Sequence, residues 1–97
     1  MQVARTILDQ LGGNRFAAMT GAHNFAGDNN SLQFSFKGSR KVNKCRVALN
    51  SMDLYDMSFY RYNTRTAELK KVAEHNGIYC DMLQDIFTDE TGLFTTL

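Results

Sequence analysis

Apolar and polar residues alternate along the middle of the chain. Apolar residues recur at every second position in the segments 32–37, 44–50 and 54–62. A two-residue period places these side chains on one face of a strand and the polar ones on the other. The side chains predicted to point inward are Leu32, Phe34, Phe36, Cys45, Val47, Leu49, Tyr55, Met57 and Phe59. The middle of the chain is therefore predicted to form antiparallel strands that bury one face.

Two further segments complete the predicted sheet. Residues 15–20 are predicted to be a strand with Phe16 and Ala18 on one face, and a weaker alternation predicts another strand at 69–74. Residues 20–31 contain two glycines and three asparagines, which favour turns with positive φ. We therefore expect residues 20–31 to form the longest loop.

The first residues of the chain have helical spacing. Val3, Ile7, Leu8 and Leu11 fall on one side of a helix, and the glycines at 12–13 supply a stop. This pattern predicts a short N-terminal helix with one apolar side.

A wider apolar stripe follows Gly77. It occupies positions i, i+1, i+4, i+5, i+8 and i+9 and consists of Ile78, Tyr79, Met82, Leu83, Ile86 and Phe87. This spacing predicts an amphipathic helix that begins after Gly77 and ends at Gly92. Asp81, Asp85 and Asp89 recur every fourth residue on its opposite side.

The whole pattern predicts an α+β fold in a single domain, residues 1–97. The antiparallel β-meander of four to five strands has one apolar face. An N-terminal helix and a C-terminal amphipathic helix packed on that face bury it together with their own apolar sides. We expect Leu93, Phe94 and Leu97 to fold back onto the sheet, and deletion of residues 78–97 to unfold the domain.

Charged residues divide the chain into a basic part and an acidic part. All eleven Lys and Arg residues occur at or before Lys71 together with five acids, which gives this part a charge of +6. The remaining residues hold five acids and no base, a charge of −5. The molecule is therefore predicted to be bipolar, a property that bears on its partners and not on its fold.

Cysteine usage and hydropathy predict a cytoplasmic protein. Two cysteines, Cys45 and Cys80, are few for a secreted domain of 97 residues, so we expect two reduced, buried thiols. No apolar run approaches the roughly 20 residues that span a bilayer, and residues 1–20 lack the pattern of a signal peptide. We therefore expect no membrane association and a location in the cytoplasm of the cell that makes the protein.

The sequence predicts no catalytic, metal or cofactor site. His75 and Cys80 are the pair best suited to an activated thiol, but no third, orienting residue is evident. A metal site needs three or four ligands, and no such set lies close together in the chain. The glycines of 20–27 lack the spacing and the Lys of a phosphate-binding loop. We therefore predict that the protein is not an enzyme and takes no cofactor.

The outward face of the predicted sheet carries bases beside tyrosines. Five bases and no acid occur from Lys37 to Arg46. Proteins that bind single-stranded nucleic acid stack bases on aromatic rings and pair phosphates with cations. The candidate surface on this face consists of Lys37, Lys44, Arg46, Tyr60 and Tyr62. The plainer interpretation is the ordinary solvated face of a sheet buried on one side.

The acidic side of the C-terminal helix is a second candidate surface. Asp81, Asp85 and Asp89 present a negative stripe that suits a basic surface on a larger protein. The plainer interpretation is a solvated helix face that balances the basic half of the chain.

Seven short motifs run through the chain in collinear order. They are Leu11-Gly-Gly-Asn-Arg-Phe16, Met19-Thr-Gly-Ala-His-Asn-Phe25, Asn30-Ser-Leu-Gln-Phe-Ser-Phe36, Met52-Asp-Leu-Tyr-Asp56, Val72-Ala-Glu-His75, Tyr79-Cys-Asp-Met-Leu83 and Thr91-Gly-Leu93. Together they resemble a family of small proteins of phages, prophages and related mobile elements, a family with no assigned activity. The resemblance implies a viral or mobile-element origin and a setting in the host-cell cytosol. It transfers no catalytic residue.

These observations favour a protein that acts by binding. The first hypothesis is a phage or mobile-element accessory protein that binds a host protein and modulates host machinery or defence. The second is a nucleic-acid-binding module that uses the outward face of the sheet. A second copy of the chain is a further candidate partner.

Overall fold

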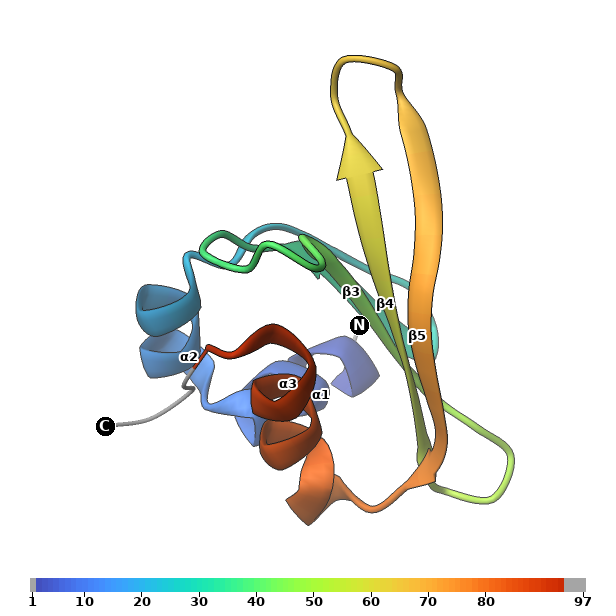
Figure 1. The fold of residues 1–97 in the computed structure, drawn as a ribbon. Coiled ribbons are helices and arrows are strands. Elements are labelled where there is room, and N and C mark those ends of the chain that lie inside the picture. Colours follow the sequence, from blue (N-terminus) through green and yellow to red (C-terminus); the bar gives the residue numbers. More distant parts are fainter. Residues whose placement is uncertain (1, 94–97) are drawn as a thin grey trace.

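The computed structural model describes residues 2–93 and has the α+β architecture that the pattern predicts. Within this range the strands form one five-stranded antiparallel sheet in the order β1-β2-β3-β4-β5, a simple meander (Figure 1). The elements are α1 (Gln2–Leu11), α2 (Gly13–Thr20), β1 (His23–Gly27), β2 (Ser31–Ser35), β3 (Lys44–Leu49), β4 (Tyr55–Asn63), β5 (Glu68–Ile78), the 3-10 helix η1 (Cys80–Met82) and α3 (Leu83–Thr91). The helices lie on one side of the sheet, which leaves its other face open.

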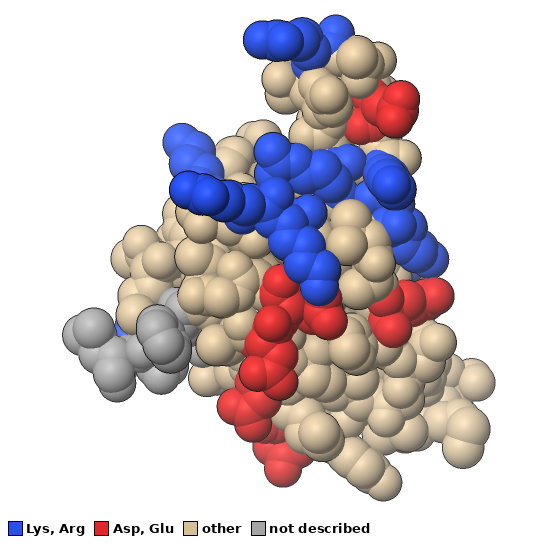
Figure 2. Space-filling model, viewed as in Figure 1, with Lys and Arg blue, Asp and Glu red and all other residues tan. Residues whose placement is uncertain are grey.

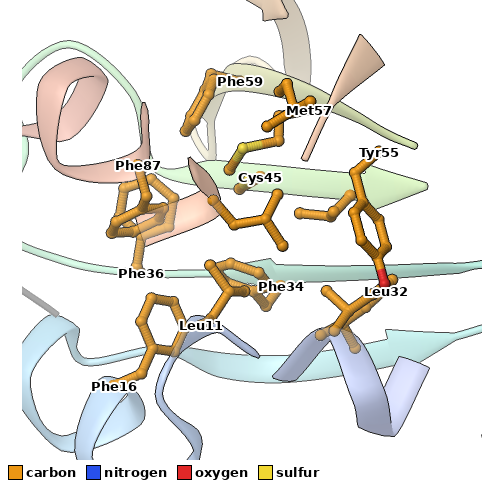
Figure 3. Packing of buried hydrophobic residues seen from close by; sticks show 14 of the residues in the cluster. Leu11, Phe16, Leu32, Phe34, Phe36, Cys45, Tyr55, Met57, Phe59 and Phe87 are labelled. Carbon is orange, nitrogen blue, oxygen red and sulfur yellow. The ribbon is translucent and has the colours of Figure 1, made fainter. Parts of the chain in front are cut away.

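The core lies between the helices and the inner face of the sheet. Phe34, Val47 and Phe59, from β2, β3 and β4, are completely buried there, which confirms the alternation predicted for the three strands. Phe87 of α3 and Phe16 of α2 complete a cluster of aromatic rings against that face (Figure 3). Their ring centroids are 5.1 Å apart, in an edge-to-face arrangement that is favourable for aromatic pairs.

Residues 15–20 form part of helix α2, so the strand predicted there is wrong. Gly12 and Gly13 have φ of 125° and 61°, a left-handed turn that ends α1 and begins a second helix. Phe16 and Thr20 are both buried, and the hydroxyl of Thr20 donates to the carbonyl of Phe16 at 2.8 Å. The spacing of four between the two buried residues is a helical signal, which the alternation of Phe16 and Ala18 concealed.

The long loop predicted at residues 20–31 contains strand β1, so this prediction is also wrong. β1 pairs with β2 through Ala26–Gln33 and Gly27–Leu32, with an irregular register between His23 and Ala26. As an edge strand it is largely exposed. It therefore lacks the alternation that marks a strand buried on one face.

The C-terminal helix is shorter than predicted. β5 continues through Gly77 to Ile78, and α3 begins at Leu83 after the turn of η1. Tyr79 and Met82, predicted to lie on the buried stripe, are 64% and 45% exposed. The apolar run from position 78 onward therefore serves three elements, each with its own inward direction.

The end of α3 agrees with the sequence. Gly92 adopts a left-handed conformation with φ of 76° and donates its N–H to the carbonyl of Thr88 at 2.8 Å, as expected for a helix stop. Leu93 packs partly against the core, as predicted. Phe94 and Leu97, predicted to do the same, lie outside the described residues.

Strands β4 and β5 extend beyond the rest of the sheet as a hairpin. The pairing of β3 with β4 ends at Lys44–Tyr60, whereas β4 and β5 stay paired as far as Asn63–Glu68. Residues 61–70, which we call the arm, are all exposed and project away from the helices (Figure 1).

The cysteines differ in environment. Cys45 is buried under the sheet, as predicted, but Cys80 is exposed in η1 and the expectation of two buried thiols is wrong. Burial raises the pKa of the Cys45 thiol. None of the helices within residues 2–93 is both long and apolar enough to cross a bilayer.

The two thiols are therefore expected to react at very different rates. A thiol-specific reagent should modify Cys80 rapidly in the native protein, because this thiol is exposed and accessible to the reagent. Cys45 should react only after addition of denaturant. Mass spectrometry of the labelled chain tests this, and native labelling of Cys45 would contradict its position in the core.

Candidate nucleic-acid interface

A row of cationic and aromatic residues crosses the open face of the sheet. Register pairs place Lys44 of β3 beside Tyr60 of β4, and Tyr60 beside Lys71 of β5. Neighbouring strands are about 4.8 Å apart, so the tyrosine lies between two cations, of which Lys71 also pairs with Glu74 at 3.5 Å. The next row toward the other end of the sheet pairs Arg46 with Ser58 and Ser58 with Glu74. Positive charge is thus concentrated at the end of the sheet from which the arm projects.

A hollow of about 520 Å³ opens beside this row, at the base of the arm. It is lined by His23, Asn24, Ser35, Phe36, Lys37, Asn43, Lys44, Tyr62 and Thr64. These residues include no acid, and we call the site the basic hollow. It brings together Lys37, Lys44 and Tyr62, three residues of the surface predicted from the sequence.

Lys37 is held at the hollow by the end of α2. Its backbone N–H donates to the carbonyl of Thr20 at 3.1 Å. Gly21 caps α2 with φ of 69°, and a Cβ added there would lie 3.4 Å from Cβ of Lys37 and 3.8 Å from its Cδ. The aliphatic stem of Lys37 therefore lies across the glycine, which limits the directions open to the ammonium group.

His23 presents one ring nitrogen for recognition. Its Nδ1 lies 2.8 Å from the carbonyl oxygen of Gly21. A carbonyl can only accept, so Nδ1 carries the hydrogen in the neutral ring. Nε2 is then an acceptor in the neutral form, and a donor when the ring takes a second proton.

Asn43 fixes the wall of the hollow that belongs to the arm. Its Oδ1 accepts from the N–H of Tyr62 at 2.8 Å, and its Nδ2 donates to the carbonyl of Tyr62 at 2.9 Å. The side-chain amide thus takes the place of a neighbouring strand just before β3 begins. Tyr62, which is 38% exposed, is held over the hollow while its ring remains accessible.

The arrangement suits an anion beside a flat ring. Lysine ammonium groups are strong donors to phosphate oxygens, and an exposed tyrosine ring offers a surface for stacking. Sequence reasoning did not predict His23, Asn24, Asn43 or Thr64. They come from turns and strand ends, and only their nearness to Lys37 and Lys44 marks them.

Arg46 and Tyr60 lie on the same face but outside the hollow. Arg46 Nη2 lies 3.2 Å from Ser31 Oγ and 3.9 Å from Asp28 Oδ2, beside a smaller hollow of about 160 Å³. The N–H of Asn30 and the hydroxyl of Ser31 lower the pKa of Asp28, with Arg46 as a smaller cause. Part of the charge of Arg46 is therefore already balanced, which makes it a weaker candidate than the two lysines.

The predicted acidic residues lie in a different region. Asp81 in η1 and Asp85 and Asp89 in α3 are all exposed. Figure 2 shows bases gathered over the arm and the adjoining end of the molecule, and a column of acids below them over α3. The structure therefore divides the candidate surface residues into two separate groups of opposite charge.

Glu90 connects the two regions. Its carboxylate lies 2.8 Å from Lys41 Nζ and 3.1 Å from His75 Nε2. The hydrogen bond from Lys41 lowers the pKa of Glu90, with a smaller contribution from His75 and against the opposing effect of burial. These contacts tie α3 to β5 and to the segment before β3.

The structure places His75 beside Glu90 and Phe59. The Nε2 of His75 contacts Glu90, and its ring lies edge-on to Phe59 with centroids 6.2 Å apart. Among the residues that the structure describes, no group of three or more His, Cys, Asp or Glu side chains is arranged to hold a metal ion.

Comparison with protein-family models, curated proteins and solved structures gives no match. The geometry of the site is therefore the basis for a functional proposal.

Proposed function

We propose that the protein binds single-stranded nucleic acid at the basic hollow and along the adjoining row of the open face. One observation carries the proposal: Lys37, Lys44 and Tyr62 surround a hollow whose lining contains no acid. Lysines would pair with phosphates, and the tyrosine would stack on a base. Stacking of this kind contributes about 1–3 kcal/mol for each base.

The neighbouring row supports a polymer over an isolated nucleotide. Lys44 lines the hollow and is also the first member of the row that continues through Tyr60 to Lys71. The same combination of cation and aromatic ring thus recurs next to the hollow. A strand whose phosphates and bases alternate matches such a track, whereas a mononucleotide would fill only the first part.

The test is binding of a labelled single-stranded oligonucleotide, measured by fluorescence anisotropy at several salt concentrations. In K37Q/K44Q we expect the affinity to fall at least tenfold at low salt. The slope of log K against log salt should become shallower by about 1.4, since each phosphate contact contributes roughly 0.7 for a single strand.

A matched control separates the hollow from general positive charge. Arg5 and Arg15 are exposed on α1 and α2 and do not line the hollow, so R5Q/R15Q has the same change in net charge. It should bind nearly as tightly as the unaltered protein. Equal losses in both variants, or no binding even at low salt, would contradict the proposal.

A second candidate function is a mobile-element accessory protein that binds a host protein. The observation in its favour is that Tyr79 and Met82, which are 64% and 45% exposed, flank Asp81 in the chain. Exposed aromatic and Met side chains are enriched at protein interfaces, and the acids suit a basic partner. The test is to capture a host protein with this chain, purify it and measure its Kd. The affinity should fall as the salt concentration rises, and D81N/D85N/D89N should lower it further.

A further inference from the structure

The arm carries a pair of like charges opposite each other. Arg61 and Lys70 are cross-strand partners, and such pairs destabilise a sheet. Neither they nor Arg65 forms an ion pair with another residue in the range 2–93. A two-stranded ribbon is marginally stable in water, so this arrangement costs stability where little is available. A bound anion would relieve it.

The cations of the arm lie on one of its faces and at its tip, while the basic hollow adjoins the other face. Alternation along β4 puts Arg61 and Lys70 on the face opposite to Tyr62 and Leu69, which are themselves cross-strand partners. The basic hollow, with Lys37 and Lys44, lies on the Tyr62 side. Arg65 is in the turn at the tip, and Glu68 is the one acid of the arm. A ligand that touched only the Tyr62 face would leave Arg61 and Lys70 unneutralised.

The dimensions of the arm fit a groove of duplex DNA. Its two strands are about 4.8 Å apart, and the major groove of B-DNA, about 12 Å wide, admits a two-stranded ribbon. Three residues of strand on each side of the turn extend about 10 Å, close to the groove depth of about 8.5 Å. The groove also has phosphates on both walls, so it would neutralise Arg61 and Lys70 and leave the lysines of the hollow free for the single strand.

We propose that the arm enters the major groove of a DNA duplex while the basic hollow holds the single strand that leaves it, so that the preferred ligand is a junction between single-stranded and duplex DNA. This inference rests on the proposed function. Its structural basis is that Tyr62 and Thr64 line the hollow although they belong to the arm. A strand held in the hollow therefore starts directly beside the groove that the arm occupies.

Binding of four labelled DNAs to the full chain is compared: a single strand, a blunt duplex, and that duplex with a 5′ or a 3′ single-stranded overhang. The overhang DNAs should bind at least tenfold more tightly than the other two. R61Q/K70Q should lower the affinity for the overhang DNA to the single-strand value and leave single-strand binding unchanged. K37Q/K44Q should weaken binding of both, and R5Q/R15Q should weaken neither.

The outcomes separate this inference from the function on which it rests. If the single strand bound as tightly as the overhang DNA, the preference for a junction would be wrong and the proposed function would still stand. An equal loss of single-strand binding in R61Q/K70Q would also overturn it, because the arm would then act as part of the hollow. Absence of all DNA binding at low salt would remove both. Circular dichroism confirms that each variant is folded, as expected for substitutions of exposed residues.

Discussion

Replacement of Phe87 by alanine is expected to lower the free energy of unfolding by about 3–5 kcal/mol, the range typical of a buried Phe. Phe87 is completely buried, and its ring centroid lies 5.1 Å from those of Phe16 and Phe36 and 6.2 Å from that of Phe59. Its ring centroid also lies 6.2 Å from that of Phe34 in β2, so Phe87 joins α2, β2 and β4 to α3 (Figure 3).

Unfolding by urea, followed by circular dichroism, measures this cost. Domains of this size are stable by about 5–15 kcal/mol, so the variant should lose a large part of its stability. Ile86→Ala is the matched control on the same helix, since Ile86 is only partly buried, and should cost about 1 kcal/mol. A cost for Phe87→Ala no larger than that of the control would show that α3 does not close the core.

The sequence predicted the central strands because each has two different faces. Phe34, Val47 and Phe59 face the helices and are buried, while Gln33, Ser35 and Arg46 remain in contact with solvent on the other face. Burial of one face is what produces a two-residue period. The same relation places Lys44 and Tyr62 on the open face.

The wrong predictions concern segments that do not bury one face against the helices. β1 is an edge strand with little burial on either face, so nothing constrains its side chains to alternate. In α2 only Phe16 and Thr20 are buried, too few residues to separate helical from strand spacing. Between Ile78 and Leu83 three elements share one apolar run, and a continuous helix fits that run equally well.

The composition of the hollow depends on contacts that are remote in sequence. Lys37 lies beyond the end of β2, yet its position follows from Phe36, whose N–H donates to the carbonyl of Asn43 at 3.0 Å. His23 reaches the site because α2 ends at Gly21 in a left-handed turn. The sequence pattern indicates charge and exposure, whereas these turns and strand ends become neighbours only through the register of the sheet.

Loss of the Asn43 side chain is expected to release the arm from the sheet. Asn43→Ala removes both hydrogen bonds to the backbone of Tyr62, each of which contributes about 0.5–1.5 kcal/mol. Local opening of the arm should then become roughly ten- to a hundredfold more frequent, since 1.4 kcal/mol is a factor of about ten. Hydrogen exchange of the amides in residues 61–70 measures this opening.

Asn50→Ala is the matched control at the other end of β3. Its Oδ1 accepts from the N–H of Met52 at 2.8 Å and of Leu54 at 3.2 Å, and its Nδ2 donates to Asp56 Oδ1 at 3.2 Å. At least as many bonds are therefore lost, without any contact to the arm. It should accelerate exchange near its own turn and leave residues 61–70 unchanged. If hydrogen exchange in the arm were no faster in Asn43→Ala than in Asn50→Ala, the Asn43 side chain would not be what holds the arm to the sheet.

The same pair of variants connects the arm to binding. Tyr62 can stack on a base only while its backbone is held against β3, so Asn43→Ala should weaken single-strand binding although no charge is lost. Asn50→Ala should bind normally, because the hollow does not include that turn. Exchange must remain slow at Phe34 and Val47 in both variants. The core then stays folded, and the loss of affinity can be attributed to opening of the arm beside the hollow.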